Sequence, residues 1–181
     1  MARLADRTYG QALFELSVEE NKVDTYAEQI SDVRTLFVSN PDLMKLLTHP
    51  QIQSEQKIEV IQKCFEGQVD DQIESFMEII IKAGRQAEMI KIFDYFLKQI
   101  KAYKHIGTAY VTSAKELTER QKLAIETRLL ELTDFISFEM VYQTDPSLIG
   151  GMIIRIGDKV VDSSIKTKLE NMSKELLSIQ L

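Results

Sequence analysis

The sequence contains few of the residues that metal sites and nucleophilic catalysis require. Its 181 residues include one cysteine, two histidines and no tryptophan. The single cysteine, Cys64, cannot form an intrachain disulfide, which fits a reducing compartment. No His-x-x-x-His or Cys-x-x-Cys pair occurs, so the spacing typical of a zinc site is absent. We therefore expect no metal ion and no cofactor.

Sequence motifs that mark frequent enzyme classes are absent too. There is no Gly-x-Ser-x-Gly nucleophile elbow and no Gly-x-x-x-x-Gly-Lys-Ser/Thr phosphate-binding loop. The nearest imitation of that loop, residues 151–159, lies within a strand pattern, whereas a phosphate-binding loop joins a strand to a helix. The 28 acidic residues would permit acid–base chemistry, but their spacing selects no catalytic pair. We therefore predict that the protein is not an enzyme and has no catalytic residues.

An excess of basic charge is also missing. The formal net charge is −6, and Asp and Glu outnumber Lys and Arg in residues 1–105 and again in residues 106–181. Nucleic acid is therefore not expected as a partner, and an anionic membrane surface would not attract the chain. No apolar run approaches the roughly 20 residues of a membrane-spanning helix, and residues 1–7 lack the apolar core of a signal peptide. We expect no direct membrane insertion.

Hydrophobic residues recur at helical spacing throughout residues 1–105, which predicts six helices. The breaks between these helices contain residues that typically end or begin them. Asn40 and Pro41 are expected to separate the second helix from a short third one, with Asn40 as its N-terminal cap. Ser54 is predicted to cap the fourth helix, and Gly67 to follow its end. The sixth helix carries Tyr103 among its inward residues.

The first and fifth predicted helices carry more apolar surface than one bundle core needs. The fifth, residues 69–83, contains a β-branched run at 79–81 that would suit a strand. Its helical repeat and its length favour a helix that is apolar nearly all round, and such a helix is buried centrally or covered by another element. We predict a groove for an amphipathic partner helix, with a plain bundle core as the alternative. The predicted groove residues are Tyr9, Ala12, Leu13, Leu16, Phe76, Ile79 and Ile80.

The hydrophobic period changes after residue 105. Residues 107–113, 137–143 and 152–156 alternate between apolar and polar side chains, as half-buried strands do. Thr118 and Gln121 form a capping box, which predicts a helix between the first two strands. This second region therefore reads as strand, helix and further strands.

The last part of the chain predicts a hairpin and a helix. Gly157 and Asp158 suit a tight hairpin turn, and Asp162 or Ser163 is expected to cap the helix that follows. That helix carries apolar residues at offsets of 0, 4, 7, 11 and 14, namely Ile165, Leu169, Met172, Leu176 and Ile179.

The sequence therefore predicts an α+β protein of two domains. Residues 1–105 form an all-α six-helix bundle, and residues 106–181 form a small α+β domain of order β-α-β-β-β-α. The joint between them is short and contains no Pro-rich or Ser-rich linker.

Two segments of the chain carry a family resemblance. Residues 9–14 read Tyr-Gly-Gln-Ala-Leu-Phe, and residues 145–158 read Asp-Pro-Ser-Leu-Ile-Gly-Gly-Met-Ile-Ile-Arg-Ile-Gly-Asp, followed by Asp-Ser-Ser-Ile at 162–165. With these segments in this order, the chain resembles the delta subunit of bacterial F-type ATP synthase, called OSCP in mitochondria. The family usually has Gly where this chain has Ser163, and Ala where it has Gly10. A positive φ at Ser163 would be strained, and Gly10 costs about 1 kcal/mol of helix propensity.

The resemblance implies a function without chemistry. It implies a non-catalytic stator subunit that links the catalytic head to the peripheral stalk and resists rotor torque during proton-driven ATP synthesis. Residues 1–105 would hold the N-terminal helices of alpha subunits, and residues 106–181 would hold b-type stalk subunits. One copy per complex would lie peripherally at the cytoplasmic face of the bacterial membrane. The alternative is a two-domain helical adaptor in another multisubunit complex.

The resemblance also points to residues for the two partners. The predicted groove would hold an alpha-subunit helix. On the stalk side the residues are Gly150, Gly151, Arg155, Gly157 and Asp162. A glycine pair in a strand pattern more often marks a bulge or a close backbone approach than a partner contact. Arg155 can either pair with an acidic stalk residue or be solvated.

Overall fold

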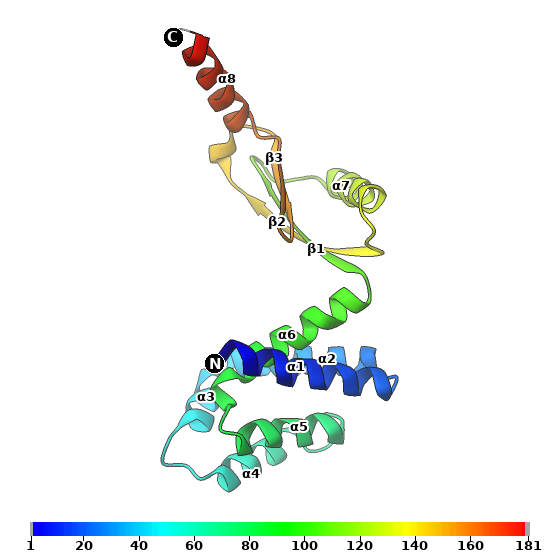
Figure 1. Ribbon diagram of the computed structural model, residues 1–181, viewed down its shortest axis with the longest axis vertical. Coiled ribbons are helices and arrows are strands. Elements are labelled where there is room, and N and C mark those ends of the chain that lie inside the picture. Colours follow the sequence, from blue (N-terminus) through cyan, green and yellow to red (C-terminus); the bar gives the residue numbers. More distant parts are fainter. Residues whose placement is uncertain (1, 180–181) are drawn as a thin grey trace. The chain divides into compact units, whose positions relative to one another are not determined.

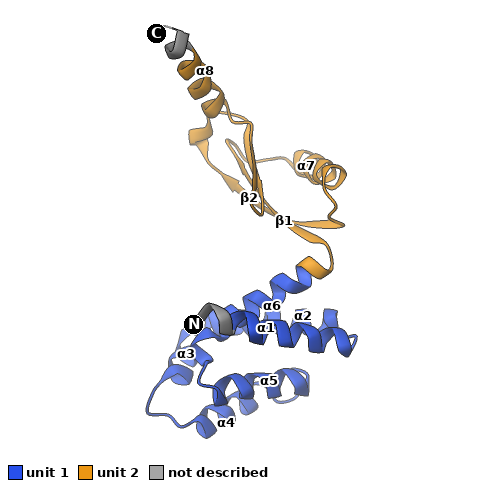
Figure 2. Cartoon of the chain, viewed as in Figure 1, with its two compact units in different colours: residues 1–101 blue, residues 102–181 orange. Residues whose placement is uncertain are grey.

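The computed structural model describes residues 2–179, and the side chains of residues 6–175. Its contacts divide the chain into two compact units, residues 1–101 (unit 1) and residues 102–181 (unit 2), which Figure 2 shows in different colours. The boundary predicted between residues 105 and 106 lies just C-terminal of this division. The helical part and the mixed part of the chain thus fall into separate units.

Unit 1 is built from helices (Figure 1). They are α1 (Ala2–Glu19), α2 (Val23–Ser39), α3 (Pro41–Thr48), α4 (Ser54–Phe65), α5 (Asp71–Lys82), the 3₁₀-helix η1 (Gln86–Glu88) and α6 (Met89–Tyr103), which ends just past the boundary. The prediction of six α-helices is confirmed for the described residues. The β-branched run at 79–81 lies inside α5, so the helical interpretation of that segment is also confirmed.

Residues that end helices act as predicted, but two predicted N-terminal caps are wrong. Pro41 is the first residue of α3, and Gly67 follows α4 with a φ of +71°. The Asn40 side chain does not cap α3, because its Nδ2 donates to the Leu36 carbonyl oxygen at 2.9 Å. Ser54 is the first residue of α4 rather than its cap. An asparagine between two helices can serve either end, and here both the backbone N–H and the side chain of Asn40 donate to the Leu36 carbonyl in the last turn of α2.

The core of unit 1 is one apolar cluster to which all six α-helices contribute. The ring of Phe37 lies within it, with centroid distances of 6.0 Å to Phe65 and 6.2 Å to Phe93. Tyr103, which we expected to point inward, is 56% exposed. Tyr103 is exposed because it lies C-terminal of residue 101, the last residue of unit 1, and so is not part of the packed bundle.

Gly10 has a packing role in unit 1. A β-carbon at Gly10 would lie 2.6 Å from Cδ1 of Tyr95 and 3.1 Å from the carbonyl oxygen of Ile92, both on α6. Beside this contact, Gln99 Nε2 donates to Gln11 Oε1 at 2.9 Å. The propensity cost of a glycine in α1 is therefore accompanied by a close approach of α1 to α6.

Unit 2 contains a four-stranded sheet (Figure 1). Its elements are β1 (Ile106–Ser113), α7 (Glu119–Leu132), β2 (Ser137–Thr144), the 3₁₀-helix η2 (Pro146–Leu148), β3 (Met152–Ile156), β4 (Lys159–Asp162) and α8 (Ile165–Ile179). The strand order is β2-β1-β3-β4; β1 pairs with β2 in parallel, and the other two pairs are antiparallel. The predicted order β-α-β-β-β-α and the α+β class are confirmed.

Helix α7 covers one face of this sheet. The predicted capping box is present at its start, where Thr118 N–H donates to Gln121 Oε1 at 2.9 Å and Gln121 N–H donates to the Thr118 hydroxyl. Leu129 of α7 packs against Ala109, which is fully buried on β1. Its neighbour Tyr110 is exposed on the opposite face, as the alternation along β1 predicts.

Candidate partner surfaces

Residues of α1 and α5 form an apolar surface on unit 1. The rings of Tyr9 and Phe76 meet edge to face, with centroids 6.5 Å apart. Ile79, about one turn after Phe76, is 52% exposed. On α1, Ala12 is exposed between Tyr9 and Leu16, which are half-buried. Phe76 itself is buried, so we term the other four residues, Tyr9, Ala12, Leu16 and Ile79, the α1–α5 surface.

Three of the predicted groove residues belong to the core instead. Leu13 and Ile80 are 0% exposed and Phe76 is 7% exposed, all three in the apolar cluster of unit 1, so their side chains offer a partner almost no surface. The neighbouring Ala12 and Ile79 are exposed. Helical spacing shows that α1 and α5 are apolar on two sides, but it does not show which side turns inward. The assignment of Leu13, Phe76 and Ile80 to a partner is therefore corrected.

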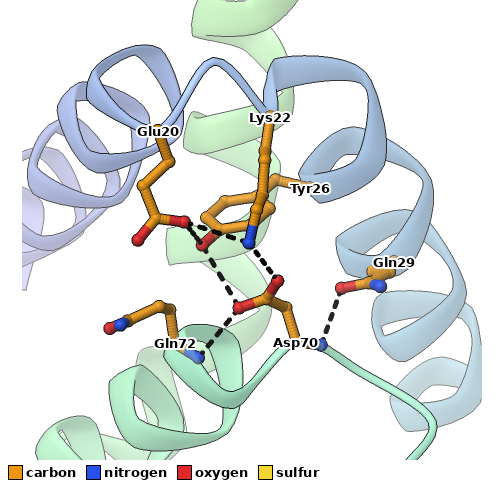
Figure 3. Close-up of polar contacts among 6 residues, drawn as sticks. All are labelled: Glu20, Lys22, Tyr26, Gln29, Asp70 and Gln72. Carbon is orange, nitrogen blue, oxygen red and sulfur yellow. Dashed lines mark hydrogen bonds and ion pairs between the residues drawn. The ribbon is translucent and has the colours of Figure 1, made fainter.

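A polar network joins the turn between α1 and α2, and the first turns of α2, to the start of α5 (Figure 3). The Nζ of Lys22 lies 2.7 Å from Oδ2 of Asp70 and 3.4 Å from Oε2 of Glu20. The Tyr26 hydroxyl donates to the same Glu20 oxygen at 2.6 Å. Asp70 also caps α5, because its Oδ1 accepts from the Gln72 backbone N–H at 3.2 Å. The network therefore joins the turn after α1 and the start of α2 to the N-terminal cap of α5.

Charge within this network shifts the ionisation of its members. The hydrogen bond from Lys22 lowers the pKa of Asp70 below its ordinary value, and the same bond raises the pKa of Lys22. Burial, followed by the hydrogen bond to the Glu20 carboxylate, raises the pKa of Tyr26 well above its ordinary value. At neutral pH Asp70 is therefore ionised and Tyr26 keeps its proton. The ion pair and hydrogen bonds of this network therefore link the start of α2 to the start of α5.

The predicted stalk-side glycines shape the entry to α8. Gly151 has a φ of +77°, and a β-carbon there would lie 2.4 Å from the carbonyl oxygen of Ser163. A β-carbon at Gly150 would lie 2.6 Å from Cδ1 of Ile165, whose N–H donates to the Gly150 carbonyl at 2.9 Å. Gly157 turns the β3–β4 hairpin with a φ of +55°. The close approaches at Gly150 and Gly151 and the positive φ of Gly157 give the three glycines backbone roles.

Asp162 holds the first turn of α8. Its carboxylate accepts from the Ser164 N–H at 2.8 Å and from the Thr167 hydroxyl at 2.7 Å, and these bonds lower the pKa of Asp162. We expected Asp162 or Ser163 to cap α8, but the cap is the buried Ser164, whose hydroxyl accepts from the Thr167 N–H at 3.2 Å. Ser163 does not adopt a positive φ, and its hydroxyl donates to the Met152 carbonyl at 2.9 Å. The strain considered for Ser163 is therefore absent.

Arg155 lies on the sheet face opposite α7. Its guanidinium carbon is 4.9 Å from the centroid of the Tyr110 ring, and the two residues pair directly across β3 and β1. A cation–π contact of this kind contributes about 0.5–1 kcal/mol at an exposed site. Arg155 remains exposed, so an acidic group of a partner can reach it.

The apolar residues predicted along the last helix include three that are exposed on α8. Ile165, Leu169 and Met172 are 43%, 53% and 59% exposed. Ile149, which is 64% exposed, precedes Gly150 at the base of the same helix. Figure 1 shows α8 leaving the sheet beside η2 and running away from it. The spacing of these residues was visible in the sequence, but their exposure was not.

Among the described residues, no three His, Cys, Asp or Glu side chains gather so that they could hold a metal ion. Within the same residues, no helix is long and apolar enough to cross a membrane. Cys64 is exposed on α4.

Comparison with known proteins identifies the family. A profile of the family described as ATP synthase delta (OSCP) subunit matches residues 5–176. The chain belongs to this family. ATP synthase subunit delta of Lachnoclostridium phytofermentans is 48% identical to it over 181 residues, which cover both chains completely. ATP synthase subunit delta of Halalkalibacterium halodurans is 32% identical over 170 residues, which cover 94% of this chain and 93% of that one. The resemblance seen in the sequence is confirmed.

A solved structure has the same fold. A chain in the cryo-EM structure of the Toxoplasma gondii mitochondrial ATP synthase hexamer matches with a TM-score of 0.71, covering 95% of this chain and 97% of that one. The two chains are 14% identical, so the likeness establishes the fold alone. Family membership identifies the protein as a delta-type subunit of an ATP synthase, which is a membrane-bound complex.

Proposed function

We propose that the protein is the non-catalytic stator subunit that links the catalytic head of an F-type ATP synthase to its peripheral stalk. Unit 1 holds the N-terminal helices of the alpha subunits, and unit 2 holds the b-type stalk subunits. One copy serves each complex, at the cytoplasmic face of the membrane. The link stops the head from turning with the rotor, so rotor torque drives ATP synthesis. The observation that carries this proposal is an accessible apolar surface on each of the two units.

The α1–α5 surface suits an amphipathic helix. The exposed side chain of Ile79 and the half-buried ring of Tyr9, which packs on the buried Phe76, would be covered by the apolar face of that helix. Ala12 is small enough for the partner backbone to approach closely. The alpha subunits supply such a helix in this proposal, laid along α1 and α5.

The strength that a stator needs favours an apolar contact. A dissociation constant of 1 nM corresponds to about 12 kcal/mol. Burial contributes about 25 cal/mol per Å² of apolar surface and must exceed that figure, because association loses rotational and translational freedom. Exposed ion pairs contribute only about 0–1 kcal/mol each. The exposed apolar side chains of both units are therefore the stronger source of affinity.

Calorimetric titration of the full chain with a synthetic N-terminal helix of the alpha subunit tests the head contact. We expect tight one-to-one binding with a negative heat-capacity change. Ala12→Asp should weaken binding at least about tenfold, because the contact would bury a carboxylate in apolar surroundings. Ala124→Asp makes the same replacement at an exposed position of α7 and serves as the matched control.

Each outcome of this titration bears on a different part of the proposal. Equal affinity of Ala12→Asp and the wild type would move the head contact away from α1. An absence of binding by the folded wild-type chain would remove the head half of the proposal and favour an adaptor role in another complex. Weakening by Ala124→Asp as well would show that the effect of the new charge is not local.

A further inference from the structure

Strand β2 forms one edge of the sheet in unit 2. The strand order is β2-β1-β3-β4, and among the described residues β2 pairs with β1 alone (Figure 1). Successive residues of a strand turn their backbone N–H and C=O groups to opposite sides, so about half of these groups in β2 face away from β1. Such an edge is a template for pairing with another chain.

The edge of β2 lacks the features that usually protect a strand from such pairing. Proteins commonly block an edge with proline, lysine, a bulge or a very short strand. Strand β2 is eight residues long and contains no proline, lysine or arginine. Its register with β1 continues without a bulge from Ser137 to Thr144. The edge is therefore long, regular and able to pair.

A groove lies beside this edge, between β2 and α7. Its volume is about 330 Å³. It is lined by Phe138, Met140 and Tyr142 from β2 and by Lys122, Leu123 and Glu126 from α7. The three β2 residues alternate along the strand, so they share the sheet face that α7 covers. We term this feature the α7–β2 groove.

The apolar part of the groove is continuous with the core of unit 2. Phe138 is buried and packs in one cluster with Ala109 and Leu129, and Met140 lies against this cluster half-buried. Leu123, on the α7 side, is 66% exposed. An apolar side chain that entered the groove would therefore contact Met140 and cover Leu123.

The charged part of the groove has an excess of negative charge. The Nζ of Lys122 lies 2.7 Å from Oε1 of Glu119 and 5.3 Å from the centroid of the Tyr142 ring. No described residue forms a hydrogen bond or an ion pair with the half-buried Glu126. Burial and then the negative charge of Glu126 raise the pKa of Tyr142, which places the carboxylate near that ring. A basic group in the groove would give Glu126 a partner.

These features select an extended segment as the occupant. A helix satisfies its backbone N–H and C=O groups internally, so it cannot pair with a strand edge. A second copy of this chain would bring two negatively charged grooves together, and each chain has a net charge of −6. In an extended segment every second side chain would enter the groove while the backbone pairs with β2.

We propose that the α7–β2 groove binds an extended segment of another protein, which adds to the four-stranded sheet beside β2. Alternate side chains of the segment enter the groove. Apolar ones contact Met140 and Leu123, and a lysine or arginine pairs with Glu126. The proposal goes beyond the stator function and does not depend on it, because its test uses no subunit of the synthase.

A synthetic peptide, acetyl-Thr-Leu-Thr-Lys-Thr-Leu-Thr-amide, is the probe for this site. Its affinity for the full chain is measured by NMR titration, and hydrogen exchange then locates the contact. At ten times the dissociation constant, exchange of the β2 amides that face away from β1 should slow about tenfold, while amides of α2 should not change. An absence of binding at about 1 mM peptide would overturn the proposal.

Two N-methylated peptides test whether the probe pairs as a strand. One carries methyl groups on the backbone nitrogens of its leucines and lysine, and the other on those of its inner threonines. Only one of these two sets of N–H groups can face β2. One methylated peptide should therefore lose affinity at least about tenfold, and the other should change little. Equal affinities of the two would show that the peptide does not extend the sheet.

Two substitutions in α7 test the apolar contact. Leu123→Ser should weaken binding about fivefold, because an apolar side chain covered by the peptide is lost. Leu132→Ser is the matched control, since Leu132 is on the same helix, is 64% exposed and does not line the groove. Equal effects of the two substitutions would remove the contact from the groove.

A charge exchange tests the role of Glu126. Glu126→Lys should weaken binding of the probe about tenfold and should strengthen binding of a peptide with glutamate in place of lysine. Both effects should decrease at high salt. If Glu126→Lys binds the two peptides as the wild type does, the choice of a basic segment is wrong.

The same measurements distinguish other uses of the sheet edges. Protection of β4 amides in place of β2 amides would show that the opposite edge accepts the peptide, and it would overturn the proposal. Protection of β2 without peptide that increases with chain concentration, together with a dimer in sedimentation, would show that the edge pairs with a second copy. That result would overturn the proposal as well.

Discussion

Replacing Gly151 with alanine should destabilise unit 2 more than the same replacement of Gly157, although both glycines have positive φ. Gly157 has open space where a β-carbon would lie, so Gly157→Ala measures the backbone cost alone, about 1 kcal/mol. At Gly151 the β-carbon would lie 2.4 Å from the Ser163 carbonyl oxygen and 3.1 Å from Cα of Ser164. These are backbone atoms at the start of α8, and moving them adds about 1–3 kcal/mol. The expected loss for Gly151→Ala is therefore about 2–4 kcal/mol.

Native-state hydrogen exchange is the appropriate assay for this pair of variants. One unfolding curve for the whole chain would combine two compact units, whereas slowly exchanging amides of β1 and β3 report unit 2 alone. Amides of α2 and α6 in unit 1 provide an internal control that neither variant should change. Equal losses for Gly151→Ala and Gly157→Ala would refute the close approach between Gly151 and the start of α8.

Three further predictions concern unit 1. Tyr26→Phe should lower the free energy of unfolding by about 1.5–3 kcal/mol, because it removes the hydroxyl that donates a hydrogen bond to the Glu20 carboxylate. Hydrogen exchange of α2 amides measures this loss. The pKa of Asp70 is lower in the folded protein than its ordinary value of 3.8, so its bond with Lys22 contributes its full stabilisation at pH values above 3.8. This stabilisation is lost as the pH falls through the lowered pKa of the folded state. Asp70→Asn, which keeps a cap for α5, should therefore lose less stability than the wild type in urea unfolding as the pH falls below about 4. Gly10→Ala should lower the thermal midpoint, because overlap with α6 costs about 1–3 kcal/mol against about 1 kcal/mol of regained helix propensity, and a higher midpoint would contradict that packing.

Local sequence patterns were enough to predict the elements of this fold. The capping box of Thr118 and Gln121 marks the start of α7 because both of its hydrogen bonds lie within one turn. Gly157 marks the β3–β4 hairpin because the turn needs a positive φ at that position. The helical repeat of α5 predicts its structure better than its β-branched run does, because the buried residues Ile73, Phe76, Met77, Ile80 and Ile81 recur at helical spacing along the whole segment. Each of these features depends on residues that are close in the sequence.

The accessible faces of the helices could not be predicted in the same way. Ala12 and Leu13 are adjacent and both apolar, yet one is exposed and the other fully buried, as are Ile79 and Ile80. The difference depends on how distant helices pack, which spacing within one helix does not record. The exposure of Leu169 on α8 has the same origin, because the helical spacing of the apolar residues of α8 is compatible with packing against either a core or a partner.

The central place of β1 in the sheet determines the order in which the chain can fold. β1 is synthesised first among the strands, but its partners come later: Ile106 pairs with Ser137, and Ser113 pairs with Met152. The sheet therefore cannot complete its ladders until residues beyond 150 have left the ribosome. The helices of unit 1 form their hydrogen bonds locally, and chains rich in local contacts fold faster. Unit 1 can thus be folded, with the α1–α5 surface in place, while unit 2 is still being translated.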